Sequence, residues 1–229
     1  MTEGLFPRER TTVAPGAVHV PAWLPLARQR ELVDACREWG RGPVPYRQTV
    51  LPGGGVMSVR SLCLGRQWVP YRYLDSVGVP FPDWLVGLGR EALVEAYGDD
   101  GGFTPDTALV NFYAPGARMG MHQDREERSG APVVSLSLGD RCVFRFGNEE
   151  SRGRPYQDVE LASGDLFVFG GASRWVHHGV PKVRPGTADP ALGLAGRLNI
   201  TLRETGLPAL SPHSPPRPLG RRREFDDRA

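Results

Sequence analysis

The feature that most constrains the fold is a series of short β-rich segments between residues 108 and 203. These segments contain β-branched, aromatic or alternating apolar residues, and turn-forming residues separate them. The predicted strands cover residues 108–113, 133–138, 142–146, 165–169, 174–180 and 197–203. Short strands joined by turns predict an antiparallel sandwich or barrel.

Two helices are expected before this region. Apolar residues recur every three or four positions between residues 25 and 40, which places them on one helical face. A second helix is expected to have Asp83 as its N-cap and to end at Gly98. Its predicted buried residues are Leu85, Leu88, Ala92, Leu93 and Ala96. Together the segments predict an α+β fold that is mostly β, with N-terminal helices packed against a jelly roll.

The length of 229 residues suits a single domain. We expect a flexible tail at residues 1–16, one domain at 17–206, and a tail rich in Pro and Arg at 207–229. The glycines at 53–55 lack the rest of a phosphate-binding motif, so they predict a hairpin turn. The net charge of +2 does not indicate a nucleic-acid partner, because such binding depends on where cations cluster.

The cysteine and hydropathy patterns indicate in which cellular compartment the protein is expected. Cys36, Cys63 and Cys142 are odd in number and widely spaced, which argues against a disulfide framework or a cysteine zinc site. No segment approaches the roughly 18 apolar residues of a membrane span, and the N-terminal stretch lacks the apolar core of a signal peptide. We therefore expect a cytoplasmic protein with no membrane partner, and no obligate protein partner is evident.

A candidate metal site lies in an H-x-D motif. His122 and Asp124 project to the same side of an extended segment, so both can contact one metal ion. His177 or His178 could supply a third ligand, but the two lie on opposite strand faces and periodicity does not choose between them. Two histidines and a carboxylate suit iron(II) oxygen chemistry. A zinc hydrolase accepts the same ligands, and a surface turn near unrelated core histidines is also compatible.

The segment at residues 197–203 alternates strictly between polar and apolar residues. Arg197, Asn199, Thr201 and Arg203 share one face. Two guanidinium groups on that face could hold the two carboxylates of a small dicarboxylate through bidentate hydrogen bonds. Asn111 and Tyr113 share a face of another strand and could bind the same ligand. A half-exposed strand and a core tyrosine would produce the same patterns.

The order of these motifs resembles the AlkB family of Fe(II)- and 2-oxoglutarate-dependent dioxygenases. Residues 111–116, followed by 122–124, are similar to the family signature. Blocks similar to later family motifs follow in order at 132–139, 164–171, 178–180 and 197–203. The resemblance is strong over about residues 105–205 and looser back to residue 17.

The resemblance implies a fold, cofactors and ligand roles. The family fold is a double-stranded β-helix, a form of jelly roll, with a nucleotide-recognition lid; it would place helices and lid at 17–104 and the catalytic jelly roll at 105–206. The implied cofactors are Fe(II), 2-oxoglutarate as co-substrate and O2. Iron would be held by His122, Asp124 and His178, the last because it precedes Gly179. Arg197 would pair with the distal carboxylate of 2-oxoglutarate; Asn111, Tyr113, Asn199 and Arg203 would complete that site, with Thr201 supporting it.

The implied activity is direct-reversal repair by oxidative dealkylation. Its substrates would be bases of the 1-methyladenine and 3-methylcytosine type in single- or double-stranded DNA, with RNA as a further candidate substrate, and its products would be formaldehyde, succinate and CO2. Trp68, Tyr71 and Tyr73 would contact the flipped base, although Trp68 could equally pack the lid against the core. Glu126 would favour cationic bases, at a position where family members often carry aspartate.

Two other functions fit the same residues. A dioxygenase of this architecture could hydroxylate a protein or a small molecule, and a non-catalytic module could bind nucleic acid. Several arginines could contact phosphates near the mouth of the site or could simply be solvated, namely Arg118, Arg125, Arg128, Arg152 and Arg154.

Overall fold

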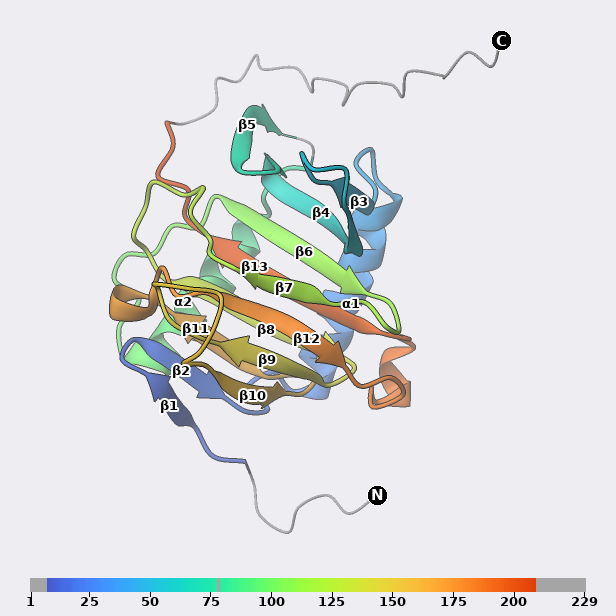
Figure 1. Cartoon of the computed structure of the whole chain (residues 1–229). Coiled ribbons are helices and arrows are strands. Elements are labelled where there is room, and N and C mark those ends of the chain that lie inside the picture. Colours follow the sequence, from blue (N-terminus) through green and yellow to red (C-terminus); the bar gives the residue numbers. More distant parts are fainter. Residues whose placement is uncertain (1–7, 78, 209–229) are drawn as a thin grey trace.

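Two antiparallel sheets face each other, and two helices cover the outer side of the larger sheet (Figure 1). This computed structural model describes residues 8–77 and 79–208. The larger sheet has the order β1-β2-β11-β8-β13-β6-β4-β3, with β5 paired to β4. The smaller sheet has the order β10-β9-β12-β7. This arrangement confirms the predicted fold class.

The bounds of the elements follow the chain. The larger sheet contains β1 (Thr11–Ala14), β2 (Ala17–Val20), β3 (Arg47–Val50), β4 (Val56–Val69), β5 (Arg72–Val77), β6 (Thr107–Tyr113), β8 (Val133–Gly139), β11 (Leu166–Phe169) and β13 (Arg197–Arg203). The smaller sheet contains β7 (Met119–His122), β9 (Cys142–Phe146), β10 (Gln157–Leu161) and β12 (His178–Val183). The helices are α1 (Leu26–Arg41) and α2 (Asp83–Tyr97), with 3-10 turns η1 (Gly171–Ser173) and η2 (Pro190–Leu192).

Helix α2 buries the predicted face, since Leu85, Leu88, Ala92, Leu93 and Ala96 all lie in the core. It ends where Gly98 adopts a left-handed φ of 83° and its backbone N–H donates to the carbonyl of Val94 at 2.8 Å. The predicted N-cap is wrong by one residue: Pro82 is the cap, and Asp83 is the first helical residue. A carboxylate in the first turn still interacts favourably with the helix dipole.

Strand β13 is buried on both faces. Leu198, Ile200 and Leu202 belong to the core shared with the helices. The alternate residues, from Arg197 to Arg203, are also buried, on the side of the smaller sheet. The alternation therefore does not mark a half-exposed strand, and it places a row of polar groups inside the molecule.

Several boundaries differ from the sequence expectations. The segment at residues 11–14, expected in a flexible tail, forms β1 and pairs with β2, so the tail prediction is too long. The strand expected at 174–180 begins only at His178, because the chain continues from η1 into a turn at residues 174–175. The turn at Gly53–Gly55 joins β3 to β4 and confirms the predicted hairpin. The predicted C-terminal tail lies outside the described residues from residue 209 onward.

Cys36, Cys63 and Cys142 are free, and all three are buried. Within residues 8–77 and 79–208, no helix combines the length and apolar character that a membrane span requires.

Candidate metal centre

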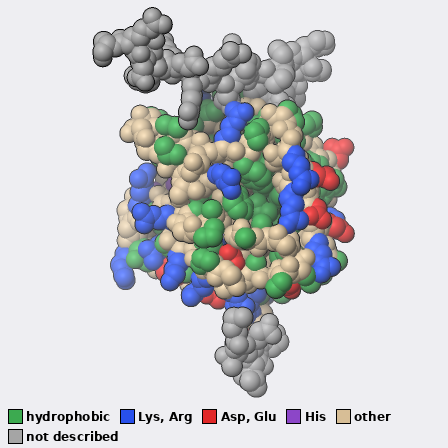
Figure 2. All heavy atoms as spheres, turned by 90° about the vertical axis from the view of Figure 1, so that its right-hand side faces the viewer, with side chains coloured by type: hydrophobic (Ala, Val, Ile, Leu, Met, Phe, Trp, Pro, Cys, Tyr) green, Lys and Arg blue, Asp and Glu red, His purple; other side chains and the backbone are tan. Residues whose placement is uncertain are grey.

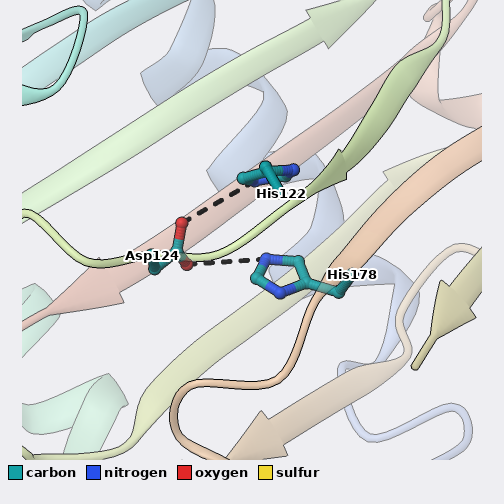
Figure 3. A group of neighbouring side chains, drawn as sticks. All are labelled: His122, Asp124 and His178. Carbon is teal, nitrogen blue, oxygen red and sulfur yellow. Dashed lines mark ion pairs between the residues drawn. The ribbon is translucent and has the colours of Figure 1, made fainter. Parts of the chain in front are cut away.

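Three potential metal ligands meet between the two sheets. His122 ends β7 and His178 begins β12, and the two residues are direct partners in the antiparallel pair. Asp124 follows two residues after β7, and Figure 3 shows its carboxylate between the two rings. Its oxygens lie 3.7 Å from Nε2 of His122 and 3.6 Å from Nε2 of His178. One ligand atom from each residue lies within 4.8 Å of the others, close enough to share one ion.

The backbone orients both imidazole rings. Nδ1 of His122 lies 3.0 Å from the carbonyl of Gly120, and Nδ1 of His178 lies 3.0 Å from that of Val176. A carbonyl can only accept, so each Nδ1 carries the proton and each Nε2 has its lone pair free for a metal. Burial lowers the pKa of His178 to about 4, which keeps its ring neutral near pH 7.

His178, and not its neighbour, joins the group. The ring of His177 turns away, and its Nδ1 lies 3.0 Å from the carbonyl of Asn148. This orientation resolves the choice that strand periodicity left open.

Asp124 is ionised although it is buried. Burial raises the pKa of its carboxyl, but the positive charge of Arg203, together with the two histidines and Arg174, outweighs burial and holds the pKa well below its usual range. Nη2 of Arg203 lies 2.9 Å from Oδ2 of Asp124. The triad therefore presents a carboxylate and the Nε2 atoms of two imidazoles, which is a suitable donor set for a divalent ion.

A cavity beside the triad is lined by polar groups of the larger sheet. It contains about 430 Å³ of empty space, part of which is open to solvent. All six residues that the sequence suggested for 2-oxoglutarate line it, namely Asn111, Tyr113, Arg197, Asn199, Thr201 and Arg203. They come from β6 and β13, which pair directly.

Arg197 is the group in this cavity that most clearly lacks a partner. Its side chain is 1% exposed, and Nη2 donates to Oγ of Ser137 at 3.1 Å. Nε and Nη1 have no hydrogen-bond partner among the described residues. A buried cation with two unsatisfied N–H groups is costly unless an anion binds there. A carboxylate fits, because it can accept two hydrogen bonds from one guanidinium group.

Arg203 differs from the sequence expectation. The hypothesis gave each guanidinium one carboxylate of the dicarboxylate, but Nη1 of Arg203 donates to Glu127 and Nη2 pairs with Asp124. Its Nε has no partner among the described residues and remains free to donate. Arg203 can therefore offer a single N–H to a ligand while it holds two carboxylates of the protein.

The other polar groups of the cavity are partly held by the sheet. Burial raises the pKa of Tyr113 to about 12, so its hydroxyl stays protonated and can donate. The amide nitrogen of Asn199 donates to Ser135 and to the carbonyl of Leu136. The hydroxyl of Thr201 donates to the carbonyl of Leu109 at 3.2 Å.

The residues suggested for base recognition lie outside the cavity lining. Tyr73 donates its hydroxyl to Glu127 at 2.5 Å, and Trp68 is its half-buried cross-strand partner in the β4–β5 hairpin. Tyr71 is 68% exposed at the tip of that hairpin. Glu126 is half-buried, and burial, reinforced by nearby Asp124, raises the pKa of its carboxyl.

Sequence reasoning missed two buried charges. Glu127 accepts hydrogen bonds from Tyr73, Arg203 and Arg174. Arg174 is 2% exposed and also donates to the backbone carbonyl of Asp124. Glu127 stands in a run of five charged residues, 124–128, and nothing in the sequence distinguishes it from the exposed Arg125 and Arg128.

Comparison with known proteins identifies the family to which this chain is related. Residues 16–203 match the model of the 2OG-Fe(II) oxygenase superfamily. An alpha-ketoglutarate-dependent dioxygenase AlkB homolog from Caulobacter vibrioides is 40% identical over 201 residues, which covers 84% of this chain and 89% of that protein. The chain belongs to the AlkB family. It is an Fe(II)- and 2-oxoglutarate-dependent dioxygenase, with His122, Asp124 and His178 as its iron site.

Two further relatives of this AlkB-family chain and one solved structure support the family assignment. The alpha-ketoglutarate-dependent dioxygenase AlkB of Escherichia coli is 37% identical over 175 residues, covering 71% of this chain and 78% of that protein. The DNA N(6)-methyladenine demethylase ALKBH1D of Arabidopsis thaliana is 34% identical over 220 residues; the match covers 83% of this chain but only 50% of that longer protein. The solved structure of OsALKBH1 superposes with a TM-score of 0.76 at 31% identity, covering 85% of this chain and all of that one.

Proposed function

We propose that this AlkB-family dioxygenase oxidatively removes alkyl groups from the nitrogens of nucleic-acid bases. The observation that carries the proposal is the pairing, in one cavity, of the His-Asp-His triad with the unpartnered guanidinium of Arg197. The triad fits iron(II), and Arg197 fits the distal carboxylate of 2-oxoglutarate. Bound together with O2, these cofactors supply the oxidising chemistry that hydroxylates the alkyl carbon.

The residues of the chain hold and orient the reactants. Arg197 donates from Nε and Nη1 to the distal carboxylate, while Arg203 donates from Nε. Asn111 and Tyr113 add polar contacts from β6, and Asn199 and Thr201 frame the cavity from β13. Phe144, Phe169 and Val180 line the same cavity and limit the access of water.

A nucleic-acid substrate is supported by the relatives and by exposed cations. Relatives include the DNA demethylase named above and the tRNA demethylase abh1 of Schizosaccharomyces pombe, which is 36% identical over 131 residues, 56% of this chain and 43% of that protein. Figure 2 shows Lys and Arg side chains across one face of the molecule, with Asp and Glu side chains mainly on its right-hand side and in its lower part. Five exposed arginines make no ion pair within the described residues: Arg118, Arg125, Arg128, Arg152 and Arg154. They are free to contact phosphates.

The position of the β4–β5 hairpin supports base recognition by its aromatic residues. Trp68 and Tyr73 are cross-strand partners, so their side chains lie on the same face of the hairpin. The hydroxyl of Tyr73 reaches the Glu127–Arg203 cluster, which places that face toward the metal centre. A base in a duplex would have to be flipped out to reach this site. Tyr71 would contact the strand from the hairpin tip, and Glu126 would favour cationic bases such as 1-methyladenine and 3-methylcytosine.

Product stoichiometry tests the proposal. The protein is incubated with Fe(II), ascorbate, 2-oxoglutarate and a methylated oligonucleotide, and formaldehyde and succinate are quantified. We expect equal amounts of both products, and a control with the same oligonucleotide lacking the methyl group should release no formaldehyde. Succinate without formaldehyde would contradict the proposal and favour a protein or small-molecule substrate. The absence of succinate would favour a binding module without turnover.

A further inference from the structure

A buried cluster of charges joins the metal centre to the β4–β5 hairpin. At its centre is Glu127, whose side chain has no exposed surface. Its Oε1 accepts from the hydroxyl of Tyr73 at 2.5 Å and from Nη1 of Arg203 at 2.9 Å. Its Oε2 accepts from Nη2 of Arg174 at 3.1 Å. The carboxylate thus binds one group from the hairpin and two cations from the catalytic region.

The cations extend the cluster to the metal ligand. Nη2 of Arg203 lies 2.9 Å from Oδ2 of Asp124. Nη1 of Arg174 donates to the backbone carbonyl of Asp124 at 3.1 Å, and its Nε donates to that of Ala131 at 2.8 Å. Arg174 therefore fixes the loop that carries Asp124 and Glu127, and Arg203 fixes the carboxylate that faces the metal.

The charges of the cluster compensate one another only when all four side chains are present. Two carboxylates and two guanidinium groups are in contact with groups of opposite charge, and each of the four side chains is almost fully buried. Removal of one partner from such a cluster leaves an uncompensated buried charge. The four side chains therefore constrain each other's positions more strongly than exposed ion pairs would.

Tyr73 connects the outer strand of the hairpin to this cluster. Among the strands that the structure describes, β5 pairs with β4 alone. Among the β5 side chains that the structure describes, Tyr73 alone forms a hydrogen bond to a residue outside the hairpin. Tyr73 is thus the direct side-chain link between β5 and the cluster at the metal centre, and its acceptor there is Glu127.

We propose that Glu127 is a positioning residue that ties the β4–β5 hairpin to the metal ligand Asp124 through Arg203, so that filling the metal and 2-oxoglutarate site orders the hairpin. Metal binding to Asp124 and hydrogen bonding of 2-oxoglutarate to Nε of Arg203 fix this guanidinium, and Arg203 in turn fixes the acceptor of Tyr73. Coupling of this kind is reciprocal, so an ordered hairpin also strengthens metal binding. The inference rests on the ligand roles proposed above, but not on the identity of the substrate.

Hydrogen–deuterium exchange of the full chain tests the coupling. Backbone amides of residues 66–75 are followed with and without Mn(II) and 2-oxoglutarate, in the wild type and in Tyr73→Phe. In the wild type we expect the two ligands to slow exchange about tenfold; in Tyr73→Phe, which keeps the ring but loses the hydrogen bond, we expect less than about twofold. Tyr97→Phe is the matched control, because it removes a hydroxyl on α2 that donates to the carbonyl of Gly16 at 2.7 Å, and neither residue belongs to the buried charge cluster. It should behave as the wild type does.

The affinity for Mn(II), measured by electron paramagnetic resonance with 2-oxoglutarate present, supplies a readout independent of turnover. Glu127→Gln removes a negative charge near the ion and loosens Arg203, so we expect about tenfold weaker binding, at the low end of the effects of outer-shell changes. Tyr73→Phe should weaken binding by about threefold through the reciprocal coupling. Because Tyr73→Phe leaves every buried charge paired, it remains informative if Glu127→Gln does not fold.

The outcomes separate this inference from the proposed function. If the wild type does not bind Mn(II), the ligand assignment fails and the inference fails with it. If the wild type binds Mn(II) but the hairpin of Tyr73→Phe is protected as strongly as that of the wild type, the coupling is absent and the metal site stands. Equal Mn(II) affinities of Tyr73→Phe and the wild type would also overturn the coupling.

Discussion

Replacing Arg197 with methionine separates its role in binding from its role in folding. The guanidinium is 1% exposed, donates once to Ser137, and has Nε and Nη1 unpaired among the described residues. If these two N–H groups serve a ligand, Arg197→Met removes two charge-assisted hydrogen bonds from the complex with 2-oxoglutarate. In the free protein it removes only a poorly compensated buried charge.

The magnitude follows from these contacts. A hydrogen bond to a charged group contributes about 1.5–3 kcal/mol, so the loss of two costs about 3–6 kcal/mol of binding free energy. At about 1.4 kcal/mol per factor of ten, the affinity for 2-oxoglutarate should fall by about 10²- to 10⁴-fold. The free energy of unfolding without ligand should stay the same or rise by about 1 kcal/mol, because an apolar side chain of similar size replaces the buried charge.

Isothermal titration of 2-oxoglutarate into the Mn(II)-loaded protein measures the first effect, and urea unfolding measures the second. Arg145→Met is the control, since Arg145 pairs with Asp158 on the outer part of the smaller sheet and should not affect 2-oxoglutarate binding. An affinity of Arg197→Met within about threefold of the wild type would refute the assignment of this guanidinium to the dicarboxylate. A large loss of stability without ligand would show instead that Arg197 is a structural residue.

Three further predictions concern the metal, the fold and the base. His122→Ala or Asp124→Ala should abolish succinate formation while circular dichroism shows the fold retained; undiminished activity in either variant would contradict the metal assignment. Asp165 has a fully buried side chain that accepts from a guanidinium, an imidazole and two backbone N–H groups, and despite burial these contacts hold the pKa of its carboxyl below its usual value. The ionised carboxylate therefore stabilises the fold above the unfolded pKa of about 3.9, and this stabilisation is lost as the pH falls through the folded pKa. Asp165→Asn should lower the free energy of urea unfolding by about 2–3 kcal/mol at pH 7 and by less in acid. An equal cost at pH 7 and pH 3 would contradict this linkage. Trp68→Ala should weaken binding of a methylated oligonucleotide by about 1–3 kcal/mol if the indole stacks on the base; unchanged binding in a fluorescence titration would show that Trp68 packs the hairpin against the core.

The part of the fold that could be predicted from the sequence is the part with strong local patterns. Residues 197–203 alternate without interruption, and β13 has those bounds. Strand β9 also has its predicted bounds, Cys142–Phe146. Strand β10 was missed because Gln157–Leu161 is mostly polar and exposed at the edge of its sheet. Strand β1 was missed for a similar reason, since only four partly exposed residues form it.

For the candidate site, too, only the features set by local chain geometry could be predicted from the sequence. The spacing of His122 and Asp124 places both ligands together, because local chain geometry determines it. The choice of His178 over His177 depends on the register of β12 against β7, and the resemblance suggested it before the register was known. Glu127 could not be predicted, because its role depends on contacts with residues from β5, β13 and the segment after η1. A charged residue in a loop shows no sign in the sequence of being buried.

Mass spectrometry of a short single-stranded oligonucleotide that carries one 3-methylcytosine tests the central claim most directly. The oligonucleotide is incubated with the protein, Fe(II), ascorbate and 2-oxoglutarate, and a parallel sample lacks 2-oxoglutarate. The account predicts the loss of one methylene unit only in the complete mixture. An unchanged mass, with succinate still forming, would contradict dealkylation of this base and show that the dioxygenase acts on a different substrate.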